Sequence, residues 1–513
     1  MTSATPRAAS SGRLRPAGSD TARRESLWGL LRSGPGLVLL TLLAGLLRGF
    51  RLGAHSLWVD EFATLQIVSL PPGEILTVAA RVNFCPPLYF WLVHGVVSAV
   101  GVSEASLRFV SAASGTLTIP VAWFLTKELT GSRTVALLAS VLLALNPLHI
   151  WYSQEARAYA LLVLLSAGAL LFLVRATRTK AVTSWAGFVA CSTAALLTHT
   201  TGPVFLAVAW LWALLSPRRA ALLRPLAIAS AVTVAAFLPF ALAVVNAVAR
   251  AEGTHSPARP LTGLELPYTL FTYAVGYSFG PSMREIQNLG PVAALRAHPV
   301  ETALGVAIVA WILCAALLRR VPARSYFLIL LVVPVAAMLL GSGTSGKAYH
   351  ARYALVGLLG YCGLAAGALR SLSPMLRAPA AAAVLTLCAW ADLQWYFSPS
   401  YWKDDSRTVV GWLGARLPPG STVAVAPPYV TGVLSHYARL QQVDMVFVPA
   451  DSVVPAAGVS ALLMTRLHHV ADPAALRSNF RRRAGPSTGD DRVGGYSILW
   501  RTTPQDSSSG VQR

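Results

Sequence analysis

The stretch Tyr-Ala-Leu-Leu-Val-Leu-Leu-Ser-Ala-Gly-Ala-Leu-Leu-Phe-Leu-Val at residues 159–174 carries no charge, and Arg175 follows it directly. An uncharged apolar run of this length is typical of a transmembrane helix. Similar runs recur along the 513 residues, of which 55% are hydrophobic and only 12% are charged. Soluble globular proteins rarely combine such values with a mean hydropathy of +0.56. The sequence therefore predicts a polytopic α-helical membrane protein.

About eleven transmembrane helices are predicted from these apolar runs. They are expected near residues 34–50, 107–125, 135–151, 159–174, 185–198, 203–215, 226–248, 302–318, 326–340, 353–369 and 378–396. With the start of the chain in the cytoplasm, every connection on the inner side is basic, as the positive-inside rule requires. Topology therefore explains the net charge of +21, and nucleic acid is not expected as a partner.

The segments outside these runs complete the predicted domain organisation. Residues 1–33, rich in Ala, Ser and Arg, are expected to form a disordered basic cytoplasmic tail. The transmembrane module covers residues 34–397, with outer loops at 51–106 and 249–300. The second loop contains Pro, Gly and several aromatic residues and is long enough to form a lid or a substrate groove.

The apolar stretch 86–100 within the first outer loop has two interpretations. It is expected to lie on the outer leaflet as a juxtamembrane helix, because another span here would place Lys127 and Arg133 outside. The alternative, that it crosses the membrane, stays open on sequence evidence.

After the last span the chain changes character. Residues 398–513 are predicted to form a small extracytoplasmic α/β domain, because short strand patterns alternate with amphipathic helical patterns between turn signals. The strands are expected at 422–426, 445–448, 461–464 and 496–500, and the helices at 406–417 and 431–440.

Carboxylates gather on the predicted outer face. Asp60 and Glu61 follow Trp58 in the first outer loop, and Glu155 lies at the mouth of a later span. Acidic residues at a membrane edge are costly, so three of them on one face indicate a functional site. The structural alternative is that they only anchor helix ends among the lipid headgroups.

Several short motifs accompany these acids. They are Ser-Leu-Trp-Val-Asp-Glu at 56–61, Pro-Pro-Leu-Tyr at 86–89, Asn-Pro-Leu-His at 146–149, Trp-Tyr-Ser-Gln-Glu-Ala-Arg-Ala-Tyr at 151–159, Arg-Tyr at 352–353 and Lys-Asp-Asp-Ser-Arg at 403–407. In this order they resemble the motifs of bacterial GT-C glycosyltransferases. The likeness is to the family related to dolichyl-phosphate-mannose protein mannosyltransferases and to aminoarabinose transferases that act on lipid A.

The likeness spans residues 36 to 500, with two departures. Cys85 stands where the family often has a His before the Pro-Pro pair. No proline follows Arg352-Tyr353, although the family element is Arg-Tyr-Leu-x-Pro. Any role of that His in binding donor or acceptor must be filled otherwise in this chain.

The resemblance implies an inverting membrane glycosyltransferase that moves a sugar from a polyprenyl-phosphate donor to a hydroxyl acceptor. A hydroxyl has a pKa far above neutral, so a carboxylate must take its proton as it attacks the anomeric carbon. The resemblance assigns that base to Asp60, with Glu61 beside it to orient or polarise. Because Trp58 and Phe62 hold this loop near the membrane, partial desolvation is expected to raise the pKa of Asp60.

The leaving lipid phosphate requires fixed cations at the membrane edge. Arg157, Lys347 and Arg352 are the candidates, and the neighbouring His350 and Tyr353 are candidate substrate contacts. The structural alternative for these cations is that they extend to the interface without touching a substrate.

Glu155 is the third candidate catalytic residue, and its role has two readings. If a divalent cation such as Mg²⁺ or Mn²⁺ is bound, Asp60 and Glu155 would supply oxygen ligands. Equally, Arg157 could balance the charge of Glu155 without a metal. The five cysteines show no paired spacing, so neither a disulfide framework nor a cysteine metal site is expected.

Other function classes remain open. A transporter or lipid flippase could use outer-face acids for coupling, although the chain shows no internal repeat. An inactive assembly partner is a third possibility, against which the intact Asp60-Glu61 pair argues. For the enzyme, the expected partners are the membrane, a lipid-linked sugar, and a glycolipid, polysaccharide or protein acceptor. The expected location is the inner (plasma) membrane, multi-pass, with the site on the extracytoplasmic face. The sequence does not distinguish a hexose from a pentose.

Overall fold

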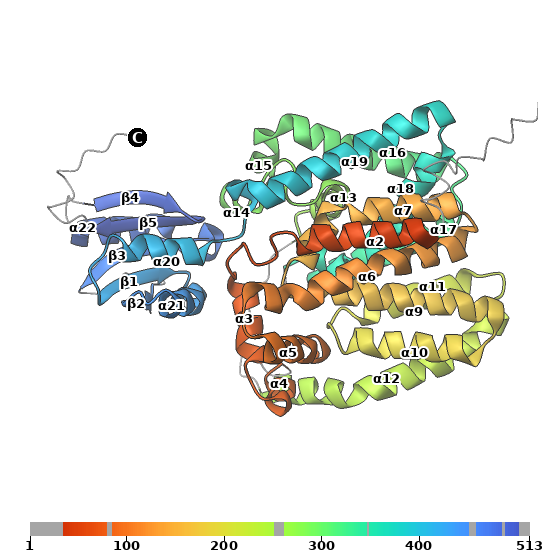
Figure 1. Cartoon of the computed structure of the whole chain (residues 1–513), viewed down its shortest axis with the longest axis horizontal. Coiled ribbons are helices and arrows are strands. Elements are labelled where there is room, and N and C mark those ends of the chain that lie inside the picture. The colour runs from red at the N-terminus through yellow and green to blue at the C-terminus, as the bar shows by residue number, and fades with distance from the viewer. Residues whose placement is uncertain are drawn as a thin grey trace, which may run out of the picture.

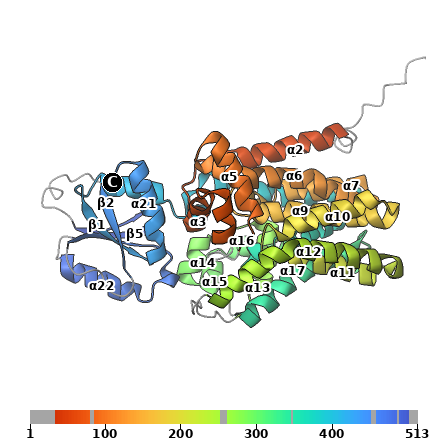
Figure 2. The same ribbon diagram turned by 90° about the horizontal axis from the view of Figure 1, so that it is seen from below.

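The computed structural model describes residues 34–79, 85–250, 261–345, 348–450, 458–484 and 488–501. Residues 34–397 contribute a helical module, and residues 406–501 contribute a C-terminal domain beside one end of it (Figures 1 and 2). We call the end of the helical module that faces the C-terminal domain the near end, and the opposite end the far end. The predicted tail at residues 1–33 lies outside the described residues.

The helical module is built from the following elements in chain order. They are α2 (Gly34–Gly49), α3 (Val59–Val68), α4 (Pro72–Val78), α5 (Leu88–Val100), α6 (Glu104–Thr130), α7 (Arg133–Ala144), α8 (Pro147–Ser153), α9 (Tyr159–Thr179), α10 (Val182–Leu196), α11 (Pro203–Leu215), α12 (Arg219–Arg250), α13 (Glu265–Val275), α14 (Met283–Leu289), α15 (Pro291–Ala297), α16 (Pro299–Leu318), α17 (Arg324–Ser345), η2 (Ala351–Ala354), α18 (Gly357–Ser371) and α19 (Pro374–Phe397). Each of the eleven predicted spans overlaps a helix in this series.

Six helices among the described residues are long and apolar enough to cross a membrane. They are the helices at Glu104–Thr130, Tyr159–Thr179, Arg219–Val245, Pro299–Leu318, Arg324–Thr344 and Pro374–Phe397. The pair α7 and α8 would make a seventh, bent by 58° at its break. Pro147 begins α8 and cannot donate a backbone hydrogen bond to continue α7, which explains the break. These helices give the chain the composition of a multi-pass membrane protein.

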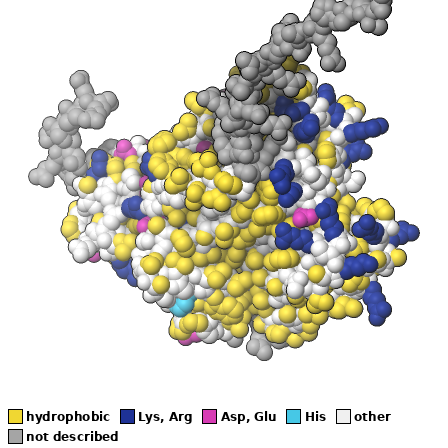
Figure 3. All heavy atoms as spheres, turned by 45° about the vertical axis from the view of Figure 1, so that its right-hand side comes forward, with side chains coloured by type: hydrophobic (Ala, Val, Ile, Leu, Met, Phe, Trp, Pro, Cys, Tyr) yellow, Lys and Arg dark blue, Asp and Glu magenta, His cyan; other side chains and the backbone are white. Residues whose placement is uncertain are grey.

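Alternating chain direction separates the connections into two sets. Glu104, at the start of α6, forms an ion pair with Arg407 of the C-terminal domain, so α6 begins at the near end. Helix α9 likewise begins at the near end, where Tyr159 lies close to Arg352. It ends at Thr179 beside the end of α6, and Arg178 pairs there with Glu128 of α6. Figure 3 shows Lys and Arg side chains gathered at the end of the module away from the C-terminal domain. This separation is the pattern that the positive-inside rule describes.

Helix α5, the predicted juxtamembrane segment, has both ends at the near end. The backbone N–H of Leu88 at its start donates to the carbonyl of Leu197, which follows α10. At its other end, the carbonyl of Gly101 accepts a hydrogen bond from the Ser106 hydroxyl, two residues after Glu104. A helix of this kind packs along the near end of the module, and its juxtamembrane position stays a prediction.

The second outer segment, predicted as a polar loop, contains three helices, α13, α14 and α15. Ser282 caps α14, accepting from the backbone N–H of Glu285 while the Glu285 carboxylate accepts from Ser282. The Ser-x-x-Glu pattern of this capping box, set among Pro and Gly residues, marks the start of a helix where the sequence predicts a loop. The described part of the segment, from residue 261 on, is therefore largely helical and packs on the near end (Figure 1).

The C-terminal domain is a five-stranded mixed sheet with flanking helices. Its elements, after the short η3 (Pro399–Tyr401), are α20 (Ser406–Gly414), β1 (Ser421–Ala426), η4 (Pro428–Val430), α21 (Thr431–Leu440), β2 (Met445–Pro449), β3 (Val459–Met464), η5 (Leu467–His469), α22 (Pro473–Ala484), β4 (Thr488–Val493) and β5 (Tyr496–Arg501). The strand order is β2-β1-β3-β5-β4, with β1 parallel to β2 and β3. Strand β4 was not predicted, because its polar sequence lacks the usual strand-forming residues at an edge position.

Candidate active site at the near end

The Trp58-Val59-Asp60-Glu61 motif forms the first turn of α3. Trp58 is the N-cap residue, and Asp60 and Glu61 lie in the first turn, where negative side chains interact favourably with the helix dipole. Consecutive helical residues point about 100° apart, so the two carboxylates face different surroundings. The structure gives them different partners.

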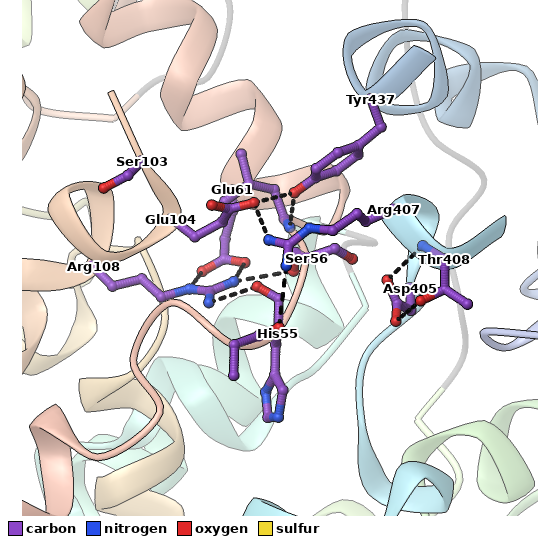
Figure 4. Close-up of polar contacts among 12 residues, drawn as sticks. His55, Ser56, Glu61, Ser103, Glu104, Arg108, Asp405, Arg407, Thr408 and Tyr437 are labelled. Carbon is purple, nitrogen blue, oxygen red and sulfur yellow. Dashed lines mark hydrogen bonds and ion pairs between the residues drawn. The ribbon is translucent and has the colours of Figure 1, made fainter. Parts of the chain in front are cut away.

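Glu61 is fully buried and held by Arg108 of α6 (Figure 4). Arg108 donates from Nε to Glu61 Oε1 at 2.8 Å and from Nη2 to Oε2 at 2.7 Å, and the N–H of Ala156 donates to Oε1 at 2.8 Å. Burial acts to raise the pKa of Glu61, but the Arg108 charge and these hydrogen bonds lower it to about 2. Glu61 therefore joins α3, α6 and the loop before α9 as an anchor.

Asp60 is partly open, with its side chain 29% exposed, and faces cations. Arg352 Nη1 lies 3.2 Å from Asp60 Oδ2, and Arg157 Nη1 donates to the Asp60 carbonyl at 3.4 Å. Burial acts to raise the pKa of Asp60, but the nearby positive charges, Arg157 first and then Arg352, hold it below the usual value. The expectation of a raised pKa was wrong, because the sequence did not reveal how many cations converge on this carboxylate.

Arg352, one of the predicted phosphate-binding cations, packs against aromatic rings. The Arg352 guanidinium lies over the rings of Tyr159 and Tyr353, at 5.8 and 5.3 Å from their centroids. Tyr353 in turn contacts His350, with ring centroids 5.6 Å apart. The structure thus brings Asp60, Arg352, Tyr353 and His350 together at the near end, while Lys347 lies outside the described residues.

Glu155 is almost fully buried and pairs with a residue that was not among the predicted site residues. Lys403 Nζ, from the linker after α19, lies 2.7 Å from Glu155 Oε2. The same ammonium lies 5.1 Å from the ring centroid of Trp58 and 5.3 Å from that of Trp151. This lysine is the first residue of the Lys-Asp-Asp-Ser-Arg motif. The resemblance of that motif to the start of the outer domain in the related family was the sequence signal that could have identified Lys403.

The suggested divalent-cation site at Asp60 and Glu155 does not fit these surroundings. Each carboxylate already has a cationic partner, Arg352 for Asp60 and Lys403 for Glu155. The described residues contain no group of three or more His, Cys, Asp or Glu side chains arranged to hold a metal ion. Hard cations require several oxygen ligands, which these two paired carboxylates do not supply.

Three buried polar atoms at the near end find no hydrogen-bond partner among the described residues. They are Trp58 Nε1, Glu155 Oε1 and Arg352 Nε. Two are donors and one is an acceptor, and native proteins rarely leave such groups unpaired when buried. Their concentration beside a carboxylate indicates a site prepared for a polar ligand.

Two further arginines, Arg466 and Arg108, contribute to the near end. Arg466 of the C-terminal domain pairs with Asp404 at 2.9 Å and stacks on Trp58 at 4.8 Å. Neither Arg466 nor Arg108 had a recognisable signal in the sequence.

A small cleft beside Arg157 is lined in part by Cys85, at the position where the related family often has a His. An open cleft of about 540 Å³ lies instead between α6 and the C-terminal domain. Its charged groups, Glu104 and Arg407, pair with each other, which indicates a domain boundary (Figure 4).

Comparisons with known proteins support the fold. Residues 85–243 match the family described as dolichyl-phosphate-mannose-protein mannosyltransferase. A relative from Aquifex aeolicus (strain VF5), described as an uncharacterized protein, is 30% identical over 177 residues. This match covers 33% of the present chain and 34% of the relative, so the chain matches about a third of that protein's length.

Solved structures match over most of the chain. ArnT from Cupriavidus metallidurans in the apo state superposes with a TM-score of 0.53 at 15% identity, covering 90% of this chain and 97% of ArnT. The same protein bound to undecaprenyl phosphate gives 0.52 at 14% identity, covering 94% and 100%. The oligosaccharyltransferase AglB from Archaeoglobus fulgidus gives 0.50 at 13% identity, covering 94% and 75%. The chain therefore shares its fold with ArnT and AglB, and its residues 85–243 resemble the dolichyl-phosphate-mannose-protein mannosyltransferase family.

Proposed function

We propose that this protein is a membrane glycosyltransferase that transfers a sugar from a polyprenyl-phosphate donor to an acceptor hydroxyl. The observation that carries the proposal is the Asp60 carboxylate, partly open and faced by Arg352 at 3.2 Å, beside unpaired donors on Trp58 and Arg352. A carboxylate next to fixed cations matches the two needs of this reaction, a proton acceptor and a phosphate site.

In the proposed step, the acceptor oxygen attacks the anomeric carbon of the donor sugar. The bond between that carbon and the phosphate oxygen breaks, and the proton of the acceptor hydroxyl passes to Asp60. The electron pair of the broken bond remains on the polyprenyl phosphate, which leaves. Direct displacement inverts the anomeric centre.

Arg157 and Arg352 have a second effect on the base. In the ligand-free protein their charges hold the pKa of Asp60 low and keep it ionised. A bound donor phosphate brings negative charge to the same cations and reduces their pull on Asp60. Donor binding would therefore strengthen the base when the acceptor arrives.

The leaving phosphate would take the unpaired Arg352 Nε together with the Arg157 guanidinium. Arg352 is fixed in place by the Tyr159 and Tyr353 rings, so it loses little freedom when it binds the phosphate. The fold match to ArnT bound to undecaprenyl phosphate supports a lipid-phosphate donor.

The proposed topology places the near end and the C-terminal domain on the extracytoplasmic face of the plasma membrane. The basic far end would then lie in the cytoplasm, following the positive-inside rule (Figure 3). The carboxylates gather at one end of the module and not at its middle, where a transporter would be expected to carry its coupling sites. No observation favours the transporter.

A reconstitution assay tests the proposal. The full chain in nanodiscs is given one radiolabelled polyprenyl-phosphate sugar at a time, hexosyl or pentosyl, with an envelope extract as the source of acceptor. Label should move to acceptor with at least one donor. In a parallel assay in proteoliposomes, movement of intact donor between the leaflets without transfer would identify a flippase.

Arg352 provides the matched variants for this assay. Arg352→Ala should raise the KM for the donor at least about tenfold, the usual scale for losing a charge-assisted hydrogen bond. Arg352→Lys should recover only part, because an ammonium lacks the bidentate fork. Arg319→Ala, at the exposed far end, serves as the control. An unchanged donor KM in both Arg352 variants would show that Arg352 does not bind the donor phosphate.

A further inference from the structure

The sheet of the C-terminal domain has a point where its chain connections diverge. Strand β1 lies between β2 and β3 and is parallel to both. The connection after β1 runs through α21 to β2 on one side, whereas the connection after β3 leads through α22 toward β4 and β5 on the other. In open α/β sheets, ligands bind outside the carboxyl ends of strands at such a divergence.

The carboxyl ends of β1 and β3 lie side by side and carry polar and aromatic residues. Ala426 ends β1 opposite Met464 of β3, and the N–H of Thr465 donates to the Ala426 carbonyl at 3.1 Å. Tyr429 follows β1, with 44% of its surface exposed, and its hydroxyl hydrogen-bonds His469 Nδ1, which follows β3. We call Tyr429, Arg466 and His469 the strand-end edge.

The strand-end edge faces the candidate active site. The Arg466 guanidinium stacks on Trp58 at 4.8 Å and lies beside the Tyr429 hydroxyl. Arg466 and Tyr429 are both close enough to Asp60 to interact with it electrostatically. Helix α21, which follows Tyr429 almost directly, packs through His436 on Phe62 of α3, with ring centroids 5.7 Å apart. Packing between these two helices fixes the distance from the edge to Asp60.

Asp60 therefore lies between two groups of side chains. On the side of the helical module are Arg157 and Arg352, which the proposed function assigns to the donor phosphate. A polyprenyl chain must stay in the bilayer, so the donor occupies that side. The acceptor hydroxyl has to reach Asp60 from the other side, where Tyr429 and Arg466 lie.

We infer that the strand-end edge is the acceptor subsite and that it binds a neutral, polyhydroxylated glycan; this inference rests on the proposed function. Asp404 pairs with Arg466 at 2.9 Å and with Arg284 at 3.8 Å, and Asp405 also acts on Arg284. Two carboxylates therefore balance the two arginines, so the edge offers hydrogen-bond donors without excess charge. The exposed Tyr429 ring offers an apolar face for the C–H groups of a sugar ring. A peptide acceptor would favour an unpaired strand, which these strand ends do not present.

The experiment measures two activities of the full chain in nanodiscs with the labelled donor. Slow hydrolysis of the donor by water needs no acceptor and reports on the transferase site alone. Transfer is then measured to a panel of mannose, glucose, galactose and arabinose oligosaccharides, with a Ser/Thr-containing peptide as the alternative acceptor. The variants are Tyr429→Ala, Tyr429→Phe and His469→Ala, with Leu440→Ala as an exposed control in the same domain. Arg466 is avoided, because its loss would remove the nearer of the two cations that pair with the buried Asp404.

Tyr429→Ala should raise the oligosaccharide KM at least about tenfold, the scale of a lost aromatic contact. The donor KM should stay within about twofold, and Tyr429→Phe should lie between Tyr429→Ala and the wild type. Leu440→Ala should behave as wild type. An unchanged oligosaccharide KM in Tyr429→Ala, hydrolysis without transfer to any oligosaccharide, or transfer to the peptide alone would each overturn the inference. A wild-type protein that neither hydrolyses nor transfers any donor would instead contradict the proposed function.

Discussion

Arg108 Nη2 lies 2.7 Å from Glu61 Oε2, and both side chains are buried. The neighbouring Asp60 is partly open and faces Arg352. Of these two adjacent carboxylates, Glu61 fixes the first turn of α3 against α6, whereas Asp60 pairs with Arg352 and keeps part of its side chain exposed. This division was not apparent in the sequence, where both acids were candidate catalytic residues.

Loss of the Glu61–Arg108 pair should destabilise the protein. Glu61→Gln leaves the Arg108 charge buried without its partner, which typically costs about 3–5 kcal/mol. The Glu61→Gln protein should therefore unfold at a lower temperature in detergent than the wild type. Size-exclusion chromatography after heating measures this. Glu128→Gln, which removes an exposed pair with Arg178 at the far end, should change stability by less than about 1 kcal/mol. Equal melting of Glu61→Gln and wild type would refute the anchoring role.

The pH dependence of activity should reveal the cations around Asp60. The acid limb of kcat/KM reports the pKa of the base in the free enzyme. Because the cations hold the pKa of Asp60 below its usual value, Asp60 stays ionised at lower pH, and kcat/KM should stay flat from about pH 7 to about pH 5. Arg352→Ala removes one positive charge, so the acid limb should move to higher pH. A limb that stays in place, or moves lower, would show that Arg352 does not act on the base.

Transfer should not require a divalent cation. Lys403 already places a positive charge 2.7 Å from Glu155, and Asp60 pairs with Arg352. Turnover in excess EDTA should therefore match turnover with added Mg²⁺ or Mn²⁺. Lys403→Met should reduce activity sharply, because Glu155 loses its counterion, and added metal should not restore the wild-type rate. Full loss of activity in EDTA, recovered by Mg²⁺, would contradict this arrangement.

Cysteine labelling in intact cells tests the proposed topology. In a variant without native cysteines, new cysteines at positions 289 and 440 should react with an impermeant maleimide, because both sites are exposed on the extracytoplasmic side of the scheme. A cysteine at position 221, near the basic start of α12, should react only after the cells are opened. Labelling of 221 in intact cells would reverse the orientation.

Much of the fold was predictable because it depends on local pattern. Uncharged apolar runs such as residues 159–174 become helices in this structure, and the strands β1, β2, β3 and β5 coincide with predicted strands. The segment after residue 249 was less predictable, because its short helices are set between Pro and Gly residues. Strand β4 pairs with β5 at the edge of the sheet through backbone hydrogen bonds. Its polar side chains give no pattern from which a strand could be predicted.

The site was only partly predictable. Short local motifs indicated Asp60, Glu155, Arg157 and Arg352. The structure gathers these residues at the near end, although Asp60 and Arg352 are 292 residues apart in the chain. The partners that decide their roles come from distant segments: Arg108 is 47 residues from Glu61, and Lys403 is 248 residues from Glu155. No local pattern predicts which charges will meet across such separations, and tertiary packing decides it.

The most direct test of the account is single-turnover transfer by Asp60→Asn, compared with wild type at saturating donor. Asn keeps the size of the side chain and most hydrogen bonding but cannot accept the proton. The rate of transfer should fall by about 10²-fold or more, the usual scale for a general base. Donor binding, measured separately by co-purification of labelled lipid, should remain, and so should the melting temperature. Transfer at the wild-type rate by a folded Asp60→Asn protein would show that Asp60 is not the base and would contradict the account.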